Sequence, residues 1–149
     1  MWCHAKFVVV AFILPSMSAI SGPQYEGYWA VKCGRLGSSV NIKASKDVEV
    51  NINDNNLFIS ASLQPTTKGR YRLLYQGVIE STNGVIFFWD DISKKRPIAD
   101  VFFEDKSMDI KWNGFYDLKK NRYIWRKEPD FVIASDDNSH IRMLKCALK

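Results

Sequence analysis

Acidic side chains are the first candidates for chemistry in this chain of 149 residues. Adjacent pairs occur at Asp90-Asp91, Glu104-Asp105 and Asp136-Asp137, and Trp89 precedes the first of them. Two carboxylates on either side of a cleft can hydrolyse a glycosidic bond. Acids that are adjacent in sequence are more typical of solvated strand ends, so we do not expect a glycosidase.

Histidine and cysteine chemistry is limited as well. The chain has two histidines, His4 and His140, and His4 lies in the N-terminal segment that we expect to be removed. A Ser-His-Asp arrangement would have to use His140, and no G-x-S-x-G motif is present. An ordinary zinc site needs more His and Cys ligands than the mature chain offers. We therefore expect no enzymatic activity, no metal site and no cofactor.

The N-terminal residues have the pattern of an export signal. A single Lys lies in Met1–Lys6, Phe7–Leu14 is an unbroken apolar run, and Pro15 leads into small residues. The run is too short to span a bilayer, which favours a cleaved signal over an anchor. We predict a signal peptide over residues 1–21, one domain over residues 22–149, and a secreted or periplasmic protein with no transmembrane segment in the mature chain.

Two cysteines remain after the predicted cleavage, Cys33 and Cys146. In an oxidising compartment the default expectation is a disulfide between them. The alternative, a reactive or metal-binding pair of thiols, lacks the C-x-x-C spacing. We expect the bridge to be structural and to join the first and last strands.

Alternation of apolar and polar residues is the dominant pattern of the chain. It runs through residues 40–44, 48–52, 57–63 and 108–112, with turn residues such as Asn113-Gly114 between the runs. Such alternation predicts antiparallel strands with one packed face and one wet face. No window shows a helical stripe. We predict an all-β domain, an antiparallel meander of about 8–11 short strands that forms a small closed or partly closed barrel, with a sandwich as the alternative.

Two segments are apolar on both faces, Val85–Trp89 and Ala99–Phe103. A strand of this kind is covered on both sides or presents aromatic side chains to a ligand. If the barrel carried a small apolar ligand, its lining would consist of Phe87, Trp89, Val101, Phe103 and Trp112.

Gly27-Tyr28-Trp29 resembles the G-x-W motif of lipocalins and their calycin relatives. In that group the Trp plugs one end of the barrel, and a basic residue from a late strand packs across its ring. The resemblance implies that Trp29 and Arg142 form a barrel-closing pair by a cation–π contact. Gly27, Trp29 and Cys33 are also spaced as in exported bacterial proteins of the invasion-associated locus B type. Both likenesses cover only a few residues.

Basic residues gather in three of the predicted loops. The formal charge is +5, and loss of Lys6 leaves +4, too mild an excess for a dedicated nucleic-acid binder. In a meander we expect these loops to share one rim, with the acidic Asp54, Glu80, Glu104-Asp105 and Glu128–Asp130 mostly at the other. Hairpin tips are hydrophilic in any case, which is the alternative explanation. The predicted partner-binding residues are Lys68, Arg70, Lys94, Lys95, Arg96, Lys119, Lys120 and Arg122.

Three functions are consistent with these patterns. The leading hypothesis is an exported barrel that binds an anionic envelope component or another protein through its loops, as an inhibitor or accessory factor. The second is a lipocalin-like carrier of an apolar ligand. The third is a carbohydrate-binding module that uses ring stacking and directed hydrogen bonds. Its candidate residues are Trp89, Asp90, Asp91, Trp112 and Asn113.

Overall fold

The computed structural model describes residues 23–35, 37–53, 56–67, 69–82, 88–135 and 140–147. Several predictions concern residues outside these ranges: the signal peptide at 1–21, Asp54, Lys68, the apolar residues 85–87 and Asp136-Asp137.

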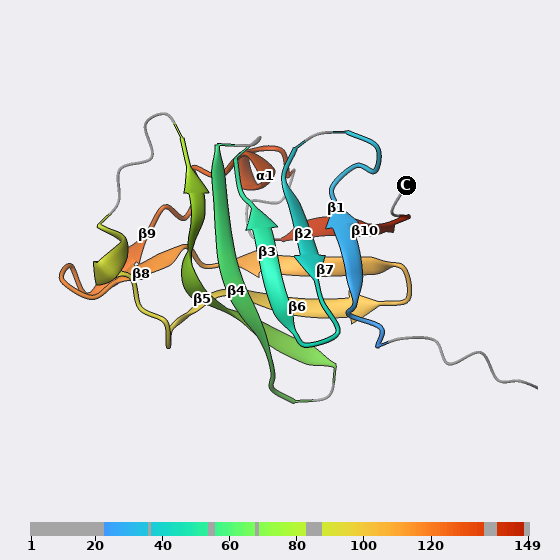
Figure 1. Cartoon of the computed structure of the whole chain (residues 1–149), viewed down its shortest axis with the longest axis horizontal. Helices are drawn as coiled ribbons and strands as arrows, with labels where there is room; N and C mark the ends of the chain where they lie inside the picture. The colour runs from blue at the N-terminus through green and yellow to red at the C-terminus, as the bar shows by residue number, and fades with distance from the viewer. Residues whose placement is uncertain are drawn as a thin grey trace, which may run out of the picture.

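Eight strands form a closed antiparallel barrel, in the order β1-β10-β7-β6-β5-β4-β3-β2 (Figure 1). Their bounds are β1 Gly27–Ala30, β2 Ser39–Ile42, β3 Asp47–Asn51, β4 Leu57–Pro65, β5 Arg70–Ser81, β6 Pro97–Glu104, β7 Ser107–Trp112 and β10 Ile141–Cys146. The predicted small all-β barrel is confirmed, and the sandwich alternative is not observed.

The alternation of apolar residues decides which side chains fill the barrel. In β3, Val48 and Val50 are buried, and Glu49 between them is exposed. Val50 lies opposite Val40 of β2 and Ile59 of β4. The same register continues around the barrel, so each strand contributes alternate side chains to one core.

The meander holds from β1 to β7 and is then interrupted. The chain leaves the barrel to form a separate two-stranded sheet, β8 (Phe115–Asp117) and β9 (Arg122–Ile124), and returns as β10 between β7 and β1. A four-residue helix, α1 (Asp130–Ile133), precedes β10, and a 3-10 turn, η1 (Trp89–Asp91), precedes β6. Neither element was predicted, because a single turn is too short to produce a helical stripe in the sequence.

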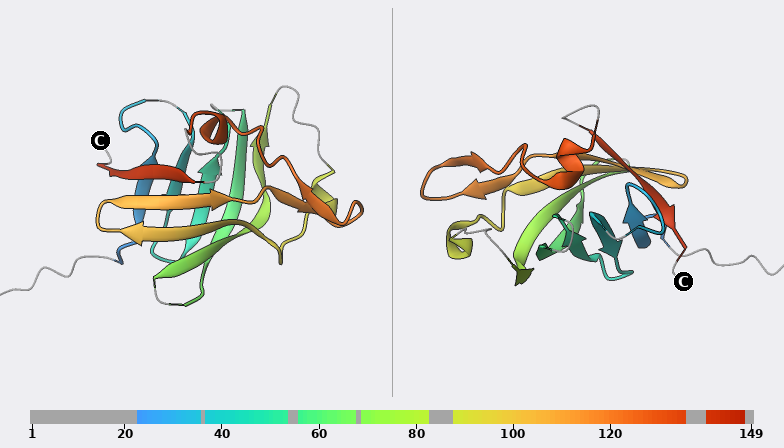
Figure 2. Two further views of the ribbon diagram at one scale, coloured as in Figure 1. Left: turned by 180° about the vertical axis from the view of Figure 1, so that it is seen from behind. Right: turned by 90° about the horizontal axis from the view of Figure 1, so that it is seen from above.

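Strand β5 is long and bent, and this opens one end of the barrel. Its register with β4 shifts near Phe58 and again near Ser60. Its pairing with β6 stops at Leu74, opposite Pro97, while the rest of β5 pairs with β4 alone. The β8–β9 hairpin and η1 project beyond the barrel on this side (Figure 2).

The opposite end, which we call the Trp29 end, is closed by side chains of the barrel strands. Trp29 is fully buried, its ring lies 5.3 Å from that of Phe103, and the ring of Tyr71 lies 5.4 Å from Phe103. The Nζ atom of Lys145 lies 5.3 Å from the centre of the Trp29 ring. A Cβ atom at Gly27 would lie 2.8 Å from Cε of Lys145, so glycine leaves room for the lysine chain.

The predicted contact between Trp29 and Arg142 is not observed, because Lys145 lies over the Trp29 ring instead. Arg142 lies on the outer face of β10, where its guanidinium is 3.5 Å from Glu104 and 3.0 Å from the hydroxyl of Ser107. The register places Lys145 opposite Trp29 and Arg142 opposite Asp109. Because side chains alternate between the faces of a strand, residue 145 can cover the Trp29 ring and residue 142 cannot.

The predicted disulfide between Cys33 and Cys146 is confirmed, with 5.5 Å between the Cα atoms. Cys146 lies at the end of β10 opposite Tyr28 of β1. Cys33 follows β1 rather than ending it, so the chain after Ala30 folds back to reach its partner. The bridge spans 113 residues of sequence and reinforces the pairing that closes the barrel.

Candidate functional site

An aromatic cluster closes the end of the barrel that β5 leaves open, which we call the Phe115 end. Phe115 of β8 is fully buried at its centre. Its ring lies 5.7 Å from Tyr75, 5.5 Å from Trp89, 5.6 Å from Trp112 and 6.2 Å from Trp125. The β8–β9 hairpin is thus fastened to the barrel through one ring that contacts residues from four other segments.

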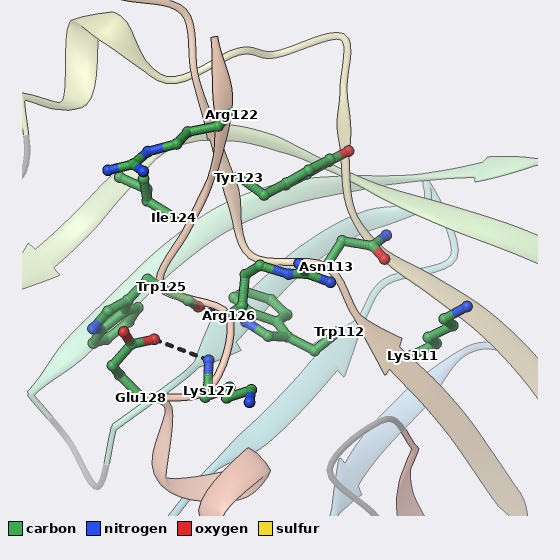
Figure 3. A pocket seen from close by; sticks show the side chains of 10 residues that line it. All are labelled: Lys111, Trp112, Asn113, Arg122, Tyr123, Ile124, Trp125, Arg126, Lys127 and Glu128. Atoms are coloured by element: carbon green, nitrogen blue, oxygen red, sulfur yellow. Dashed lines mark hydrogen bonds between the residues drawn. The ribbon is translucent and has the colours of Figure 1, made fainter. Parts of the chain in front are cut away.

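This docking forms a groove of about 530 Å³ between the end of β7 and the chain from β9 to α1 (Figure 3). Its volume falls within the range of small-ligand sites. It is lined by Lys111, Trp112, Asn113, Arg122, Tyr123, Ile124, Trp125, Arg126, Lys127 and Glu128.

The groove exists because β7 loses its neighbour on one side. β10 pairs with β7 only as far as Ile110, opposite Ile141. Beyond that point the indole Nε1 of Trp112 donates a hydrogen bond to the carbonyl oxygen of Trp125, at 3.0 Å. Trp125 has a φ of 55°, a left-handed conformation that turns the chain out of β9.

Gly114, between β7 and β8, allows the end of β9 to approach the backbone closely. Its φ is 92°, and a Cβ atom at this position would collide with the carbonyl oxygen of Ile124. Only glycine fits this combination of backbone conformation and contact. The Asn113-Gly114 pair, predicted as a turn, therefore joins β7 to the hairpin at the edge of the groove.

Positive charge dominates the groove. Lys111, Arg122, Arg126 and Lys127 line it, and none of them forms an ion pair with another residue in the described ranges. Glu128 is the one acid in the lining, and its carboxylate accepts a hydrogen bond of 2.9 Å from the backbone N–H of Lys127. Cations without internal partners are available to an anionic ligand.

Tyr123 supplies a fixed wall rather than a reactive group. Its hydroxyl donates to the carbonyl oxygen of Pro97 at 3.1 Å, and its ring packs edge-on against Tyr116 at 5.1 Å. Burial is the main cause that raises the pKa of Tyr123 above its ordinary value, so the phenol stays neutral and keeps this bond at neutral pH.

A second and larger groove, of about 860 Å³, lies on the outer wall of β5, β6 and β7. It contains the predicted partner-binding residue Arg70, together with Arg72, Lys111 and His140. Here acids balance the cations: Asp100 and Asp109 lie among them, and Arg72 lies 3.6 Å from Asp100. We therefore favour the first groove as the site for an anion.

The three predicted basic loops do not share one rim. Arg70 lies opposite Phe102, toward the far end of β6, whereas Lys94, Lys95 and Arg96 lie just before β6 begins at Pro97. The prediction assumed that every second connection between strands lies at the same rim. It was wrong because Trp89 lies in η1 rather than in a strand, so the number of strands before the Lys94 loop differs from the number assumed. Lys119, Lys120 and Arg122, in the β8–β9 turn and at the start of β9, do lie at the Phe115 end with the loop of Lys94.

The acidic loops are likewise divided. Glu80 near the end of β5 and Glu128–Asp130, which leads into α1, lie at the Phe115 end with the basic loops of Lys94 and Lys119. Glu104-Asp105, between β6 and β7, lies at the other end. The barrel therefore has no simple division into a basic rim and an acidic rim over the residues that the structure describes.

The five predicted sugar-binding residues are separated by the fold. Trp112 and Asn113 line the groove. The other three, Trp89, Asp90 and Asp91, lie in η1. There Oδ2 of Asp91 lies 2.8 Å from Nζ of Lys119, and Trp89 packs against Phe115.

The residues predicted to line an apolar cavity belong to the packed core. Val101, Phe103 and Trp112 are buried, with exposed fractions of 2%, 7% and 6%. Each contributes to the single hydrophobic cluster that fills the barrel. Trp89 packs at the edge of this cluster, and Phe87 lies outside the described residues.

Sequence reasoning missed most of the cations in the groove. Of the four, it selected Arg122 alone, and it did not select Lys111, Arg126 or Lys127. The run from Trp125 to Lys127, an aromatic residue followed by two cations, has the composition of a binding site for an anion and could have been selected from the sequence. Its proximity to Lys111 depends on where β10 stops pairing with β7.

Two general comparisons complete the description of the chain. In the described part, the structure contains no helix with the length and apolar character needed to cross a membrane. Comparison of the sequence with models of protein families and with curated proteins, and of the structure with solved structures, finds no match.

Proposed function

We propose that this protein is an exported, non-catalytic binding protein that holds an acidic polysaccharide in the groove at the Phe115 end. The observation that carries the proposal is the set of four cations, Lys111, Arg122, Arg126 and Lys127, which line one groove without ion-pair partners among the described residues. The sole acid of the lining is engaged by its own backbone neighbour.

The chemistry of the lining favours a sugar polymer that carries carboxylate or sulfate groups. The guanidinium groups of Arg122 and Arg126 suit planar or tetrahedral anions because each can donate two parallel hydrogen bonds. Tyr123 and Trp125 add flat apolar surface, and Asn113 adds an amide that can donate and accept. A simple inorganic anion would leave the aromatic walls of the groove unused.

Export is part of this proposal. The Cys33–Cys146 disulfide is compatible with an extracellular or periplasmic protein, because such bonds persist mainly in oxidising compartments. The expected signal sequence points the same way. An acidic envelope polysaccharide would be accessible to the protein in that compartment.

The test is calorimetric titration of the protein with a sulfated oligosaccharide, a uronate oligosaccharide, a neutral oligosaccharide and an acidic peptide, at two salt concentrations. Binding of the acidic sugars, weakened by salt, supports the proposal. The double variant Arg126→Gln, Lys127→Gln should lower that affinity by about tenfold or more, as expected when two charge-assisted contacts are lost.

The matched control removes two charges at the Trp29 end with Lys43→Gln, Lys106→Gln, and should change the affinity by less than about twofold. Equal losses in both double variants would show nonspecific attraction and contradict the proposal. Binding of the acidic peptide in preference to the sugars would identify a protein partner and also contradict it.

A further inference from the structure

Two large apolar side chains are exposed beyond the groove, where η1 meets the β8–β9 turn. The exposed fraction is 79% for Phe88 and 57% for Leu118. They come from separate segments that touch: the backbone N–H of Leu118 donates to the carbonyl oxygen of Asp91 at 2.8 Å, and Nζ of Lys119 lies 5.9 Å from the centre of the Phe88 ring. We call residues 88–96 and 118–122 the projecting tip.

The projecting tip is held together by further contacts. The backbone N–H of Ser93 donates to the carbonyl oxygen of Tyr116 at 2.9 Å, and Ile92 forms an antiparallel bridge with Asp117. Lys119 pairs with Asp91 at 2.8 Å. These contacts hold η1 and Ser93 against the β8–β9 hairpin, and Phe88 and Leu118 are exposed in this arrangement.

The projecting tip carries more positive than negative charge. The cations of the tip are Lys94, Lys95, Arg96, Lys119, Lys120 and Arg122, and its acids are Asp90 and Asp91. Lys94, Lys95 and Arg122 have no ion-pair partner among the described residues. The guanidinium of Arg96 lies 4.9 Å above the ring of Tyr116.

We propose that the projecting tip docks on an anionic lipid bilayer, with Phe88 and Leu118 in the interface and the cations of the tip among the headgroups. Phe and Leu flanked by Lys and Arg form the pattern by which peripheral proteins hold to membrane surfaces. A soluble acidic polymer would satisfy the cations but leave both apolar side chains in water. A bilayer satisfies both, which decides between the two partners.

This inference concerns a different surface from the groove and does not depend on the proposed function. Apart from Arg122, which belongs to both, the cations of the groove and of the projecting tip are different residues. A variant at the tip can therefore lose membrane binding while it keeps binding to acidic sugars, and Arg126→Gln, Lys127→Gln should do the reverse.

The experiment is cosedimentation of the protein with vesicles of phosphatidylglycerol and phosphatidylcholine, compared with vesicles of phosphatidylcholine alone. We expect binding to the anionic vesicles that is at least about tenfold stronger, since each cation near the surface contributes to attraction. The double variant Phe88→Ala, Leu118→Ala should lower that binding by about tenfold or more, because two apolar side chains leave the interface.

The matched control is Phe102→Ala, Leu144→Ala. It removes the same two residue types from the barrel wall, where their exposed fractions are 39% and 47%. Binding of this variant should stay within about twofold of the unaltered protein, because these side chains lie outside the proposed contact. Circular dichroism of each variant verifies that it is folded.

A second pair of variants tests the charges. Lys94→Gln, Lys95→Gln should lower binding to anionic vesicles by about tenfold or more, and Lys43→Gln, Lys106→Gln should not. Three outcomes would overturn the proposal: no binding to anionic vesicles, equal binding to both kinds of vesicle, or equal losses in the tip variants and their controls. Retention of an acidic sugar by the tip without vesicle binding would also overturn it.

Discussion

The two ends of the barrel are closed in different ways. At the Trp29 end, Trp29, Phe103, Tyr71 and Lys145 all come from barrel strands, and the ring and ammonium contacts lie between 5.3 and 5.4 Å. At the Phe115 end, the plug comes from a hairpin outside the barrel and from η1, and its central ring is Phe115. One end is built by the strands themselves, and the other by an inserted segment.

The difference shows where a surface of this fold is free to acquire a function. At the Trp29 end these four side chains are tied to strand register, so a change there disturbs the core. The segments outside the barrel, residues 88–96 and 113–135, need only to keep Phe115 and its neighbours in place. Their remaining residues can contribute to the groove and form the projecting tip, as loops on rigid scaffolds commonly do.

Removal of the disulfide should give the largest loss of stability. The variant Cys33→Ala, Cys146→Ala loses a bridge across 113 residues, and we expect the free energy of unfolding to fall by roughly 4–5 kcal/mol. Urea denaturation measures this loss. Because the bridge supports the closure of β1 on β10, acidic-sugar binding by the folded fraction should be unchanged. If the folded fraction of this variant bound acidic sugar more weakly than the unaltered protein, the two ends of the barrel would not be independent.

Truncation of the Phe115 ring should be nearly as costly and should also affect the groove. Phe115→Ala removes a fully buried aromatic side chain, so we expect a loss of about 3–5 kcal/mol. Unlike the disulfide variant, it should weaken binding in the groove by more than about tenfold, because the hairpin loses its anchor. Trp29→Ala is the control, with a similar loss of stability and unchanged binding. Equal effects on binding would contradict the separation of the ends.

Replacement of the cation over Trp29 should have a smaller effect. Lys145→Met keeps most of the alkyl chain but removes the charge, so we expect a loss of about 1 kcal/mol from the cation–π contact. Arg142→Met, which removes an exposed ion pair with Glu104, should cost less than about 0.5 kcal/mol. Thermal unfolding of the two variants compares them. A larger loss of stability in Arg142→Met than in Lys145→Met would favour Arg142 as the residue that closes the barrel.

The smallest effect expected is a pH dependence at the hairpin turn. The backbone N–H of Lys120 donates to Asp117 at 2.8 Å, and this bond is the main cause that lowers the pKa of the carboxyl below its ordinary 3.8. The ionised form therefore contributes stability above pH 3.8 that is lost as the pH falls through the lowered pKa. Asp117→Asn should be less stable than the unaltered protein at neutral pH.

The difference between Asp117→Asn and the unaltered protein should shrink in acid, where the carboxyl is protonated. Urea denaturation at neutral pH and at a pH well below 3.8, where the folded carboxyl is also protonated, measures both values. A difference of the same size at both pH values would mean that the charge of Asp117 does not stabilise the hairpin.

Much of the barrel was predictable from local pattern. Alternation in the β3 segment, where Val48 and Val50 alternate with Glu49, places the valines on one face whatever the neighbouring strand is. The pairing of Cys33 with Cys146 was predictable because two cysteines allow a single connectivity. The position of Trp29 at one end of the barrel followed from its motif.

The groove could not be predicted in the same way. Its walls depend on the point where β10 stops pairing with β7, at Ile110, and on the path of the chain after Trp125. The sequence analysis took the apolar run that ends at Trp89 as a strand, whereas Trp89 lies in η1. An apolar run has the same composition in a buried strand and in a turn packed under aromatic rings, so the two cannot be told apart by pattern. This error assigned Arg70 to the same rim as Arg96.

The sequence by itself determined the all-β class, the inward faces of the strands and the disulfide, because these follow from period-two alternation and from residue counts. Only the tertiary structure decided that Lys145 rather than Arg142 covers Trp29, that the β8–β9 hairpin leaves the meander, and that four cations meet in one groove. These features depend on register and docking between residues far apart in the chain, where a shift of one position exchanges the face on which each side chain lies.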